Sequence, residues 1–330
     1  MSTLPWRATV ENVETGLGAY MKKIAFFLLL SSLCLAQQDV KRPHILGVAH
    51  MALYVSDLAK ARVFYEDFLG YGEPYHLMNK EGTAERIAFI KINEDQYLEL
   101  FAEKPREEGF QLNHISFWTD DAEAMRGYLA SKGIKVPEKV GVGQIKNKNF
   151  NVNDPDGHIV EIVQYMPDGW TRRETGKFMP DTRISTQMRH IGVLIDKLDA
   201  SLPFYQGILG FTNIWQGPPN GKTLSWVNMQ VPDGADYLEM MLYNKAPETH
   251  AQRGTKNHIC LVVPDIEKAV AILESRRAAT GYAQPIEIKT GQNGKRQANL
   301  YDPDETRVEI MEPNTFDGKP VPSSKAPAPR

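Results

Sequence analysis

Hydrophobic and polar positions follow a regular succession of two periods along the chain. From Val48 the period is two, as in a β-strand, and one face of this strand is expected to carry Val48, His50, Ala52 and Tyr54. After Asp57, which can cap a helix, the period becomes helical, with an apolar stripe of Leu58, Ala61, Phe64, Tyr65, Phe68 and Leu69. Strand-like runs follow, among them "RIAFIKI" from Arg86 and "QYLELFA" from Gln96. The pattern therefore predicts a βαβββ unit.

This unit recurs along the chain. The segment "VAHMALYVSDLAKARVFYEDFLGY" from Val48 aligns without a gap with "MRHIGVLIDKLDASLPFYQGILGF" from Met188, at an offset of 140 residues. Each half divides again, because a strand, an acidic cap and an amphipathic helix recur from Leu112 and from Lys256. Self-similarity of this kind takes precedence over any local pattern. We therefore expect an α+β protein of four βαβββ units, paired within each half because the linkers are short.

Eight polar residues recur at matched places in the predicted strands. Each unit contributes a histidine from its first strand and a glutamate from its last strand, at spacings of 49, 15 and 47 residues in the first half and 49, 19 and 51 in the second. The two sets are His50, Glu99, His114 and Glu161, and His190, Glu239, His258 and Glu309.

Two imidazoles and two carboxylates on neighbouring strands are a suitable ligand set for a divalent metal ion. They match borderline cations such as Zn²⁺, Ni²⁺, Fe²⁺, Mn²⁺ or Co²⁺, whose charge the two carboxylates neutralise. A closed structural zinc site would be expected to use more cysteine. Four protein ligands leave positions for water or substrate on a six-coordinate ion.

Each of these residues has a simpler explanation when it is taken alone. A histidine on an apolar strand is more often part of the core, and a glutamate between leucines is more often at a sheet edge. Buried carboxylates paired with protonated histidines would also fit the pattern, at a large desolvation cost. No structural requirement restores both residue types together in four units, so the joint pattern favours metal binding.

The composition is that of an ordinary soluble protein and restricts the partners. Of 330 residues, 42% are hydrophobic and 24% are charged, and the formal net charge is −3. The chain is long enough for two domains with their own cores. A weakly acidic chain without long basic runs gives no indication of nucleic-acid binding, so small molecules are the expected partners.

An export signal is expected near the start of the chain, at residues 21–36. Residues 21–36 combine a basic start with the apolar run "IAFFLLLSSLCL" and a small residue, Ala36, at the end. This pattern is typical of a cleaved secretory signal, and it is too short for a comfortable membrane span. We therefore expect an exported, periplasmic or secreted protein without a stable membrane anchor after cleavage. Residues 1–20 form an uncertain extension, since Met21 can be the true start; a short anchor or a buried helix is the alternative for the apolar run.

The cysteines and the C-terminal segment give less information about function. Cys34 would leave with the signal, so Cys260 would be the single cysteine of the mature chain and is expected in the core. Residues 319–330, "KPVPSSKAPAPR", lack apolar periodicity and are expected to form a disordered tail.

The strand histidine, the "FYxxxLG" helix end and the "DPDGxxxE" closing strand together resemble the vicinal oxygen chelate superfamily. This superfamily includes glyoxalases, bleomycin resistance proteins and extradiol dioxygenases. The resemblance covers about residues 44–313. It implies two glyoxalase-like half-barrel domains, residues 44–167 and 186–313, with a metal ion in the cleft of each.

The resemblance also implies roles for the eight residues. Both sets match the four-ligand pattern of glyoxalase-like members, in which a ligand glutamate also moves a proton. The expected metal ligands are His50, Glu99, His114, Glu161, His190, Glu239, His258 and Glu309. The expected catalytic residues are Glu161, Glu99, Glu309 and Glu239, and Tyr97, Phe117 and Trp118 are expected to line the first cleft.

Two departures from the family patterns stand out. Extradiol dioxygenases commonly have a tyrosine about ten residues before the last glutamate, whereas this chain has Asn151 and Asn299 there, with Tyr301 nearby. In the second half, Glu305 replaces the glycine of "DPDG" and is expected to distort the turn before Glu309.

The resemblance implies a divalent-metal-dependent enzyme of the isomerase or lyase type. Such an enzyme chelates vicinal oxygens of a small substrate and stabilises an enolate-like intermediate. An extradiol-type ring-cleaving dioxygenase and a non-catalytic protein that sequesters a small molecule are the alternatives. Export makes a glutathione adduct an unexpected substrate, because glutathione is chiefly cytosolic. A homodimer is compatible with the resemblance, because units that pair between chains would bring the same ligands together.

Overall fold

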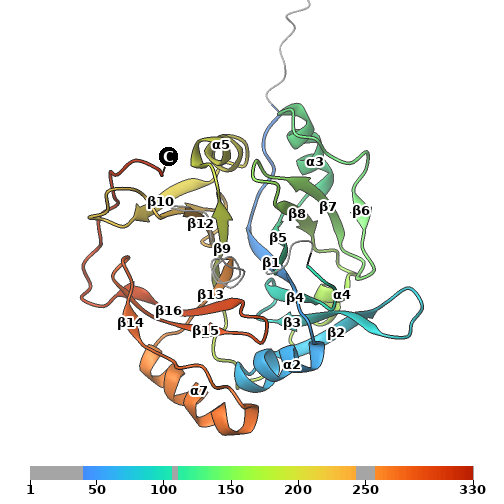
Figure 1. Cartoon of the computed structure of the whole chain (residues 1–330). Coiled ribbons are helices and arrows are strands. Elements are labelled where there is room, and N and C mark those ends of the chain that lie inside the picture. Colours follow the sequence, from blue (N-terminus) through green and yellow to red (C-terminus); the bar gives the residue numbers. More distant parts are fainter. Residues whose placement is uncertain (1–39, 106–110, 243–256, 330) are drawn as a thin grey trace, which may run out of the picture. The chain divides into compact units, whose positions relative to one another are not determined.

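Each half of the chain folds into one curved eight-stranded sheet in the computed structural model, which describes residues 40–105, 111–242 and 257–329 (Figure 1). Residues from Arg42 onwards form one compact unit. The expected extension 1–20 and signal 21–36 lie outside the described residues, so export stays a prediction. Within the described residues, every helix is too short or too polar to cross a membrane.

The first half contains two units in the order that the sequence predicts. Its strands pair in the order β2-β3-β4-β1-β5-β8-β7-β6, so the two units share one sheet. The elements are β1 (Gly47–Tyr54), α2 (Leu58–Arg62), the π-helix η1 (Val63–Phe68), β2 (Gly72–Met78), β3 (Glu85–Lys91), β4 (Tyr97–Phe101), β5 (Leu112–Trp118), α3 (Ala122–Ser131), β6 (Gly141–Val142), β7 (Lys148–Asn153) and β8 (Ile159–Gln164).

The second half repeats this topology after a short helix, α4 (Trp170–Arg173). Its strand order is β10-β11-β12-β9-β13-β16-β15-β14. The elements are β9 (Met188–Ile195), α5 (Leu198–Leu202), the π-helix η2 (Pro203–Ile208), β10 (Thr212–Gly217), β11 (Trp226–Gln230), β12 (Tyr237–Leu242), β13 (His258–Val262), α7 (Ile266–Thr280), β14 (Lys289–Thr290), β15 (Lys295–Tyr301) and β16 (Arg307–Thr315). The α+β fold of four βαβββ units and the pairing within each half are confirmed.

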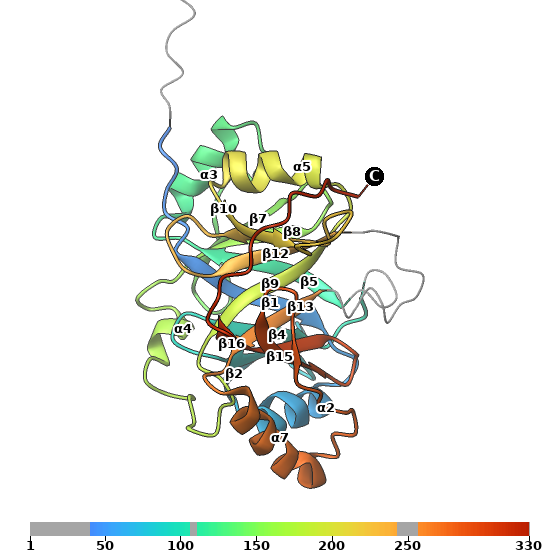
Figure 2. The same cartoon turned by 90° about the vertical axis from the view of Figure 1, so that its left-hand side faces the viewer.

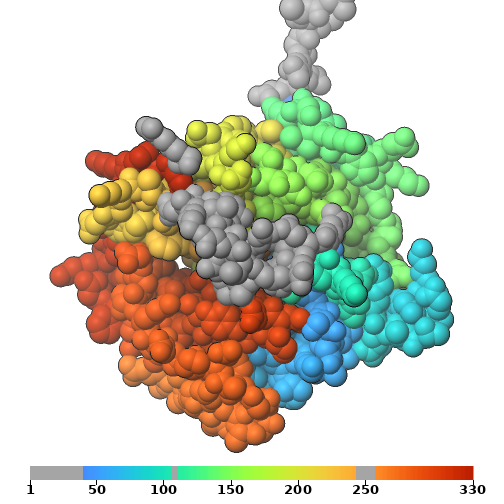
Figure 3. All heavy atoms as spheres, viewed as in Figure 1, coloured from blue at the N-terminus to red at the C-terminus, as the bar shows by residue number. Residues whose placement is uncertain are grey.

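The helices of the two halves pack against one another. Figures 1 and 2 show α2 beside α7 at one end of the molecule and α3 beside α5 at the other, and Figure 3 shows the α7 segment (orange) against the α2 segment (blue). The rings of Phe68 and Tyr282 stack at 4.3 Å, and the Tyr128 hydroxyl donates to the Ile208 carbonyl at 2.7 Å. Apolar residues of both halves therefore form one continuous core.

Two reciprocal hydrogen bonds join the halves at equivalent places. The Tyr65 hydroxyl donates to Asp302 of the second half at 3.0 Å, and the Tyr205 hydroxyl donates to Asp154 of the first half at 2.8 Å. Both aspartates begin the "DPD" turns that precede the last strand of each half. The first aspartate of this motif thus connects the halves.

One residue of the predicted strand face lies on the opposite side of the sheet. Val48 packs in the core under the helices, whereas Ala52 and Tyr54 lie on the other face, as expected. The register between β1 and β5 shifts between Val48 and His50, so Ala49 is an additional residue in β1. A bulge of this kind reverses the alternation at one point. The prediction for Val48 was therefore wrong.

The C-terminal segment is a second correction, because residues 319–329 are not a disordered tail. Ser324 exchanges hydrogen bonds of 2.8 Å with Gln216 of the edge strand β10, and the Pro327 carbonyl accepts from the Leu224 N–H at 2.8 Å. Ala326 and Ala328 pack against the core. Small apolar residues and prolines, which lose little entropy on ordering, thus cover an open sheet edge.

Candidate metal centres

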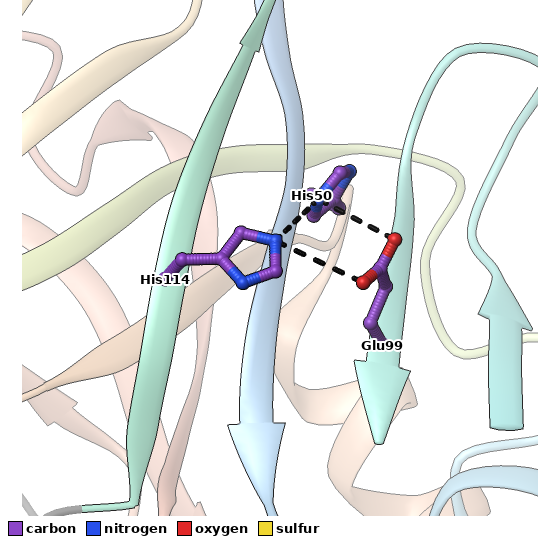
Figure 4. A group of neighbouring side chains, drawn as sticks. All are labelled: His50, Glu99 and His114. Carbon is purple, nitrogen blue, oxygen red and sulfur yellow. Dashed lines mark hydrogen bonds and ion pairs between the residues drawn. The ribbon is translucent and has the colours of Figure 1, made fainter. Parts of the chain in front are cut away.

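Four adjacent strands bring the first set of predicted ligands together. In the order β4-β1-β5-β8, they carry Glu99, His50, His114 and Glu161 on the concave face of the sheet. All four side chains are buried. Figure 4 shows His50, Glu99 and His114 converging on a common point from three strands. Parallel pairing of β1 with β4 and of β5 with β8 therefore accounts for the repeated spacing of histidine and glutamate.

The distances in this first set fit a shared metal ion. The Nε2 atoms of His50 and His114 lie 2.9 Å apart, and the carboxylate oxygens of Glu99 and Glu161 lie 3.5 to 3.8 Å from these nitrogens. Ligands about 2.1 Å from one ion are separated by about 3.0 to 3.6 Å at bond angles of about 90 to 120°. The imidazole–carboxylate distances are too long for direct hydrogen bonds. The two imidazole nitrogens therefore lie within hydrogen-bond distance of each other, and both carboxyl groups converge on them without a direct hydrogen bond.

Burial keeps both imidazoles of the first set neutral. Burial and the neighbouring His114 lower the pKa of His50 well below its usual 6.5, and burial lowers the pKa of His114 to about 4. Burial and the charge of Glu161 raise the pKa of Glu99 well above its usual value. Burial raises the pKa of Glu161 to about 7, against the hydrogen bonds that it accepts. Pairs of protonated histidine and carboxylate therefore do not describe this site, and neutral imidazole is the form that binds metals.

The two glutamates of the first set differ in their neighbours. Glu161 accepts hydrogen bonds from the Ser116 hydroxyl at 3.4 Å and from the Asn149 amide at 3.3 Å. Among the described residues, no donor forms a hydrogen bond with Glu99, which faces Phe89 of β3 instead. Hydrogen bonds from protein groups can therefore stabilise the charge of Glu161 when no ion is bound. The described residues form no such bond with Glu99.

Aromatic residues line the concave face around this first set. Tyr97 stacks on His50 with ring centres 4.9 Å apart, so it lies beside the first set, as predicted. Tyr97 belongs to an apolar cluster on this face. The cluster also contains Tyr54, Phe89, Phe101 and the partly buried Tyr75, Tyr165 and Trp170. Phe117 was predicted wrongly, because it lies in the core under the helices, 5.1 Å from the ring of Phe211. Trp118, on the same face as His114, packs on Tyr165 at 5.8 Å.

The second set converges in the same way from β12, β9, β13 and β16. The Nε2 atoms of His190 and His258 lie 3.1 Å apart, and Glu239 lies 3.9 Å and 3.3 Å from them. Three possible ligand atoms, one from each of His190, His258 and Glu309, all lie within 4.8 Å of one another. Burial, opposed by the nearby Glu239, lowers the pKa of His190 to about 3. The structure thus brings together both predicted sets.

The surroundings of the second set are more polar than those of the first. Asn228 replaces Phe89 opposite the β12 glutamate, and the Cys260 thiol lies 3.7 Å from Glu309, where the first half has Ser116. Arg307 Nη2 lies 2.7 Å from His258 Nδ1. A cavity of about 290 Å³ opens beside the set, lined by Trp215, Trp226, Glu239, Asn299, Arg307 and Glu309 among others.

The turn before Glu309 keeps its shape despite Glu305, contrary to the expected distortion. Glu305 has a φ of 66°, close to the 87° of the equivalent Gly157. In both halves the first aspartate of the turn makes the same pair of backbone hydrogen bonds at 3.0 Å. Glu305 therefore adopts a left-handed conformation that is unfavourable for residues with a Cβ, and the departure is local strain.

A cavity between helical elements of the two halves lies away from both sets. It has a volume of about 720 Å³ and lies between α2–η1 and the region around α7 and β15, lined by Phe64, Phe68, Tyr282 and Asp302 among others. None of the eight predicted ligands lines it. It lies at the boundary between the two halves and does not belong to the candidate metal centres.

Sequence reasoning did not identify the residues that support the ligands. Ser116 follows His114 by two positions and so shares its strand face, a signal that period-two alternation could have given. Asn113, whose Oδ1 lies 2.9 Å from His114 Nδ1, and Asn149 on β7 carried no recognisable pattern. Arg307 was equally inconspicuous, because its role depends on the register between β13 and β16.

The fold and both sets define a class of half-barrel proteins whose inner face carries histidines and glutamates that could hold a metal ion. The chain belongs to the Glyoxalase/Bleomycin resistance protein/Dioxygenase superfamily, whose family model matches residues 47–162 and 187–310.

Among known relatives, the uncharacterized protein YaeR of Escherichia coli is 32% identical over 127 residues, which are 36% of this chain and 95% of that protein. Lactoylglutathione lyase of Schizosaccharomyces pombe is 28% identical over 216 residues, 60% of this chain and 66% of the relative. Glyoxalase I of Saccharomyces cerevisiae is 23% identical over 317 residues, 86% of this chain and 92% of the relative.

Solved structures of ring-cleaving enzymes share the fold. The 2,3-dioxygenase LapB of Pseudomonas sp. KL28 has a TM-score of 0.62 at 14% identity, covering 86% of this chain and 99% of that one. Homoprotocatechuate 2,3-dioxygenase of Brevibacterium fuscum has a TM-score of 0.61 at 19% identity, covering 87% and 76%. At these identities the likeness concerns the fold alone.

Proposed function

We propose that this chain is a divalent-metal-dependent enzyme of the isomerase or lyase type that acts on a small substrate with two neighbouring oxygen atoms. The observation that carries the proposal is the first set, in which two buried histidines and two buried glutamates converge, with Nε2–Nε2 and Nε2–carboxylate distances of 2.9 to 3.8 Å. An ion held there by His50, Glu99, His114 and Glu161 would polarise a carbonyl and stabilise negative charge that develops on its oxygen.

Glu161 is the residue that we assign to proton transfer. Its carboxylate has hydrogen-bond donors of its own, Ser116 and Asn149, so it can carry charge when it is not bound to an ion. Glu99 lacks such donors among the described residues, which favours a permanent ligand. A glutamate positioned beside the carbon next to a carbonyl contributes about 10²- to 10⁴-fold to the rate of proton transfer.

The cleft wall supports chemistry that excludes water. Tyr97 stacks against His50 and fixes its ring, and Phe89 faces Glu99 across the sheet. Apolar walls lower the local dielectric, which strengthens interactions with charge that develops during the reaction. The same walls suit a substrate with an apolar or aromatic part.

The relatives support this reaction type more than ring cleavage. Two of them are named lactoylglutathione lyase and glyoxalase I, and one of these matches 86% of this chain. Non-haem iron oxygenases characteristically bind iron through two histidines and one carboxylate, whereas the first set here has a second carboxylate. Asn151 stands on β7 opposite Glu161, where the dioxygenase pattern has a tyrosine.

The proposal is tested with the full chain after removal of all metal and reloading with Zn²⁺, Ni²⁺, Co²⁺ or Mn²⁺. The assay follows deuterium uptake from heavy water at the carbon next to the carbonyl in small hydroxycarbonyl compounds and in thiol adducts of ketoaldehydes. We expect metal-dependent exchange that is lost in His50→Ala. The matched control is His44→Ala, an exposed histidine that pairs with Asp120 outside the cleft.

Two results would overturn this assignment. Anaerobic loading with Fe²⁺ followed by oxygen-dependent cleavage of a catechol would favour the dioxygenase alternative. Tight binding of a small molecule by metal-free protein, with no turnover under any loading, would favour sequestration.

A further inference from the structure

The two halves differ at the outer nitrogen of one predicted ligand. In the first half, His114 Nδ1 lies 2.9 Å from Asn113 Oδ1. In the second half, the equivalent His258 Nδ1 lies 2.7 Å from Arg307 Nη2. Asn257, the counterpart of Asn113, accepts instead from the Leu194 N–H at 3.1 Å. The second histidine has thus exchanged an amide partner for a guanidinium.

This exchange determines which nitrogen of His258 carries the proton. A guanidinium in a protein only donates hydrogen bonds and is not deprotonated. His258 Nδ1 must therefore accept, and the proton of the neutral ring must sit on Nε2, the nitrogen that faces His190. A metal ion needs the lone pair of Nε2. In the first half the Asn113 oxygen accepts a hydrogen bond from the Nδ1–H group, which leaves the Nε2 lone pair of His114 available for an ion.

The sheet itself builds the contact with Arg307. Strand pairing places Arg307 directly beside His258, whereas the first half has Ile159 at the equivalent place. Gly192 supplies the room for the histidine ring, since a Cβ there would lie 1.9 Å from its Cε1 atom. The first half has Ala52 at this register position, facing His114. Two independent substitutions in the second half therefore favour the orientation of His258 that reaches Arg307.

The charge of Arg307 acts in the same direction. Its guanidinium lies against the ring that would bind the ion, so it repels a divalent cation. It also supplies positive charge near the two carboxylates of this set, Glu239 and Glu309, and lines the same cavity as they do. In this half, a fixed arginine thus provides part of the charge that an ion would provide in the first.

We infer that Arg307 closes the second half to divalent metal ions, so that the chain binds one ion, through the His50 set. This inference rests on the proposed metal-dependent function of the first half. It makes the second half a metal-free cleft that retains the ligand residues, with Arg307 as the residue that decides between the two states.

Metal stoichiometry of the full chain tests this inference directly. Metal-free protein is loaded with Co²⁺ or Zn²⁺ and desalted, the ions per chain are measured by elemental analysis, and affinities are measured by competition with a coloured chelator. We expect one ion in the wild type and none in His50→Ala. Arg307→Ile, which copies Ile159, is expected to bind a second ion at least about 10-fold more tightly than the wild type does, because the guanidinium hydrogen bond no longer opposes it.

The combined variants locate the ions. His50→Ala with Arg307→Ile is expected to hold one ion, and Ile159→Arg is expected to lose the ion of the first half. Circular dichroism shows whether each variant is folded, and His50→Ala tests the inference even if Arg307→Ile does not fold. Two ions in the wild type, one ion in His50→Ala alone, or no gain in folded Arg307→Ile would each overturn the inference. A wild type without any ion would instead refute the proposed function.

Discussion

The two halves of the molecule carry the same eight-residue plan on the same strand register, yet they present different chemistry. The first set faces Phe89, Ser116 and Asn113, whereas the second faces Asn228, Cys260 and Arg307. The ligands themselves are identical in type and similar in separation. The comparison shows that both sets retain every predicted ligand type, whereas the hydrogen-bond partners of their histidines differ.

A similar contrast exists between the two turns that join the halves. Asp154 and Asp302 are equivalent, and each accepts a hydrogen bond from a tyrosine of the opposite half. Asp154 also contacts His158 Nδ1 at 2.9 Å, whereas the second half has Thr306 at this place. Burial raises the pKa of Asp154, but the bonds from His158 and Tyr205 outweigh it and lower the pKa overall. Burial and the nearby Asp304 raise the pKa of Asp302 to about 7, against the hydrogen bonds from Thr306 and Tyr65.

The largest expected effect concerns the glutamates that end each half. Glu161→Gln keeps the size of the side chain but cannot accept the substrate proton, so exchange should fall by about 10²- to 10⁴-fold. The matched Glu309→Gln should cause a smaller loss, since the second half is closed to metal. Both variants are compared in the deuterium-exchange assay at equal metal content. Equal losses would contradict the difference between the halves.

The pH dependence of stability should separate the two aspartates. A carboxyl group with a raised native pKa lowers stability as the pH rises from its unfolded pKa, about 4, to its native pKa. For Asp302, whose native pKa is about 7, the free energy of unfolding should therefore fall between about pH 4 and pH 7, and Asp302→Asn should reduce this fall by about 4 kcal/mol. Urea denaturation at both pH values measures the effect.

Asp154→Asn should change the free energy of unfolding at neutral pH in the opposite direction to Asp302→Asn. The lowered pKa of Asp154 means that its charge contributes stability above the unfolded pKa, which is lost as the pH falls through the native value. Its replacement should therefore lower the free energy of unfolding at neutral pH by about 2 kcal/mol. A gain in stability at neutral pH would show that this aspartate is not stabilised as its contacts indicate.

Loss of the hydroxyl group should cost more stability at Tyr205 than at Tyr65. Tyr205→Phe removes a hydrogen bond to a charged carboxylate and should cost about 2 kcal/mol. Tyr65→Phe removes a bond to Asp302, which is protonated over a wider pH range, and should cost about 1 kcal/mol at a pH near 6. Thermal or urea unfolding at that pH gives both values. The reverse order would contradict the assigned charge states.

The smallest expected effect concerns the residue with positive φ in each turn. Glu305→Gly should raise the free energy of unfolding by about 1 kcal/mol, because glycine adopts this conformation without strain. The matched change, Gly157→Ala, should lower it by a similar amount, since a Cβ there meets no atom within 4 Å and only the backbone is strained. Loss of stability in Glu305→Gly would point to a contact of this glutamate that outweighs the strain.

Much of the architecture followed from the periodic pattern. The order of strands and helices, the helix cap at Asp57 and the four-fold repeat were all readable, because each depends on local spacing. The convergence of His50, Glu99, His114 and Glu161 also followed, since matched positions on paired strands must meet. The bulge at Ala49 and the packing of the tail on β10 were not readable, because both depend on what lies across the sheet or at its edge.

The sequence by itself therefore determined which residues can be ligands, through their type, their spacing and their repetition in four units. Only the tertiary structure decided what each ligand faces. Asn113 beside His114 and Arg307 beside His258 are set by strand register and by the room at Gly192, and no spacing rule contains them. The physical reason is that the proton position on an imidazole depends on its hydrogen-bond partner, which the fold brings from another strand.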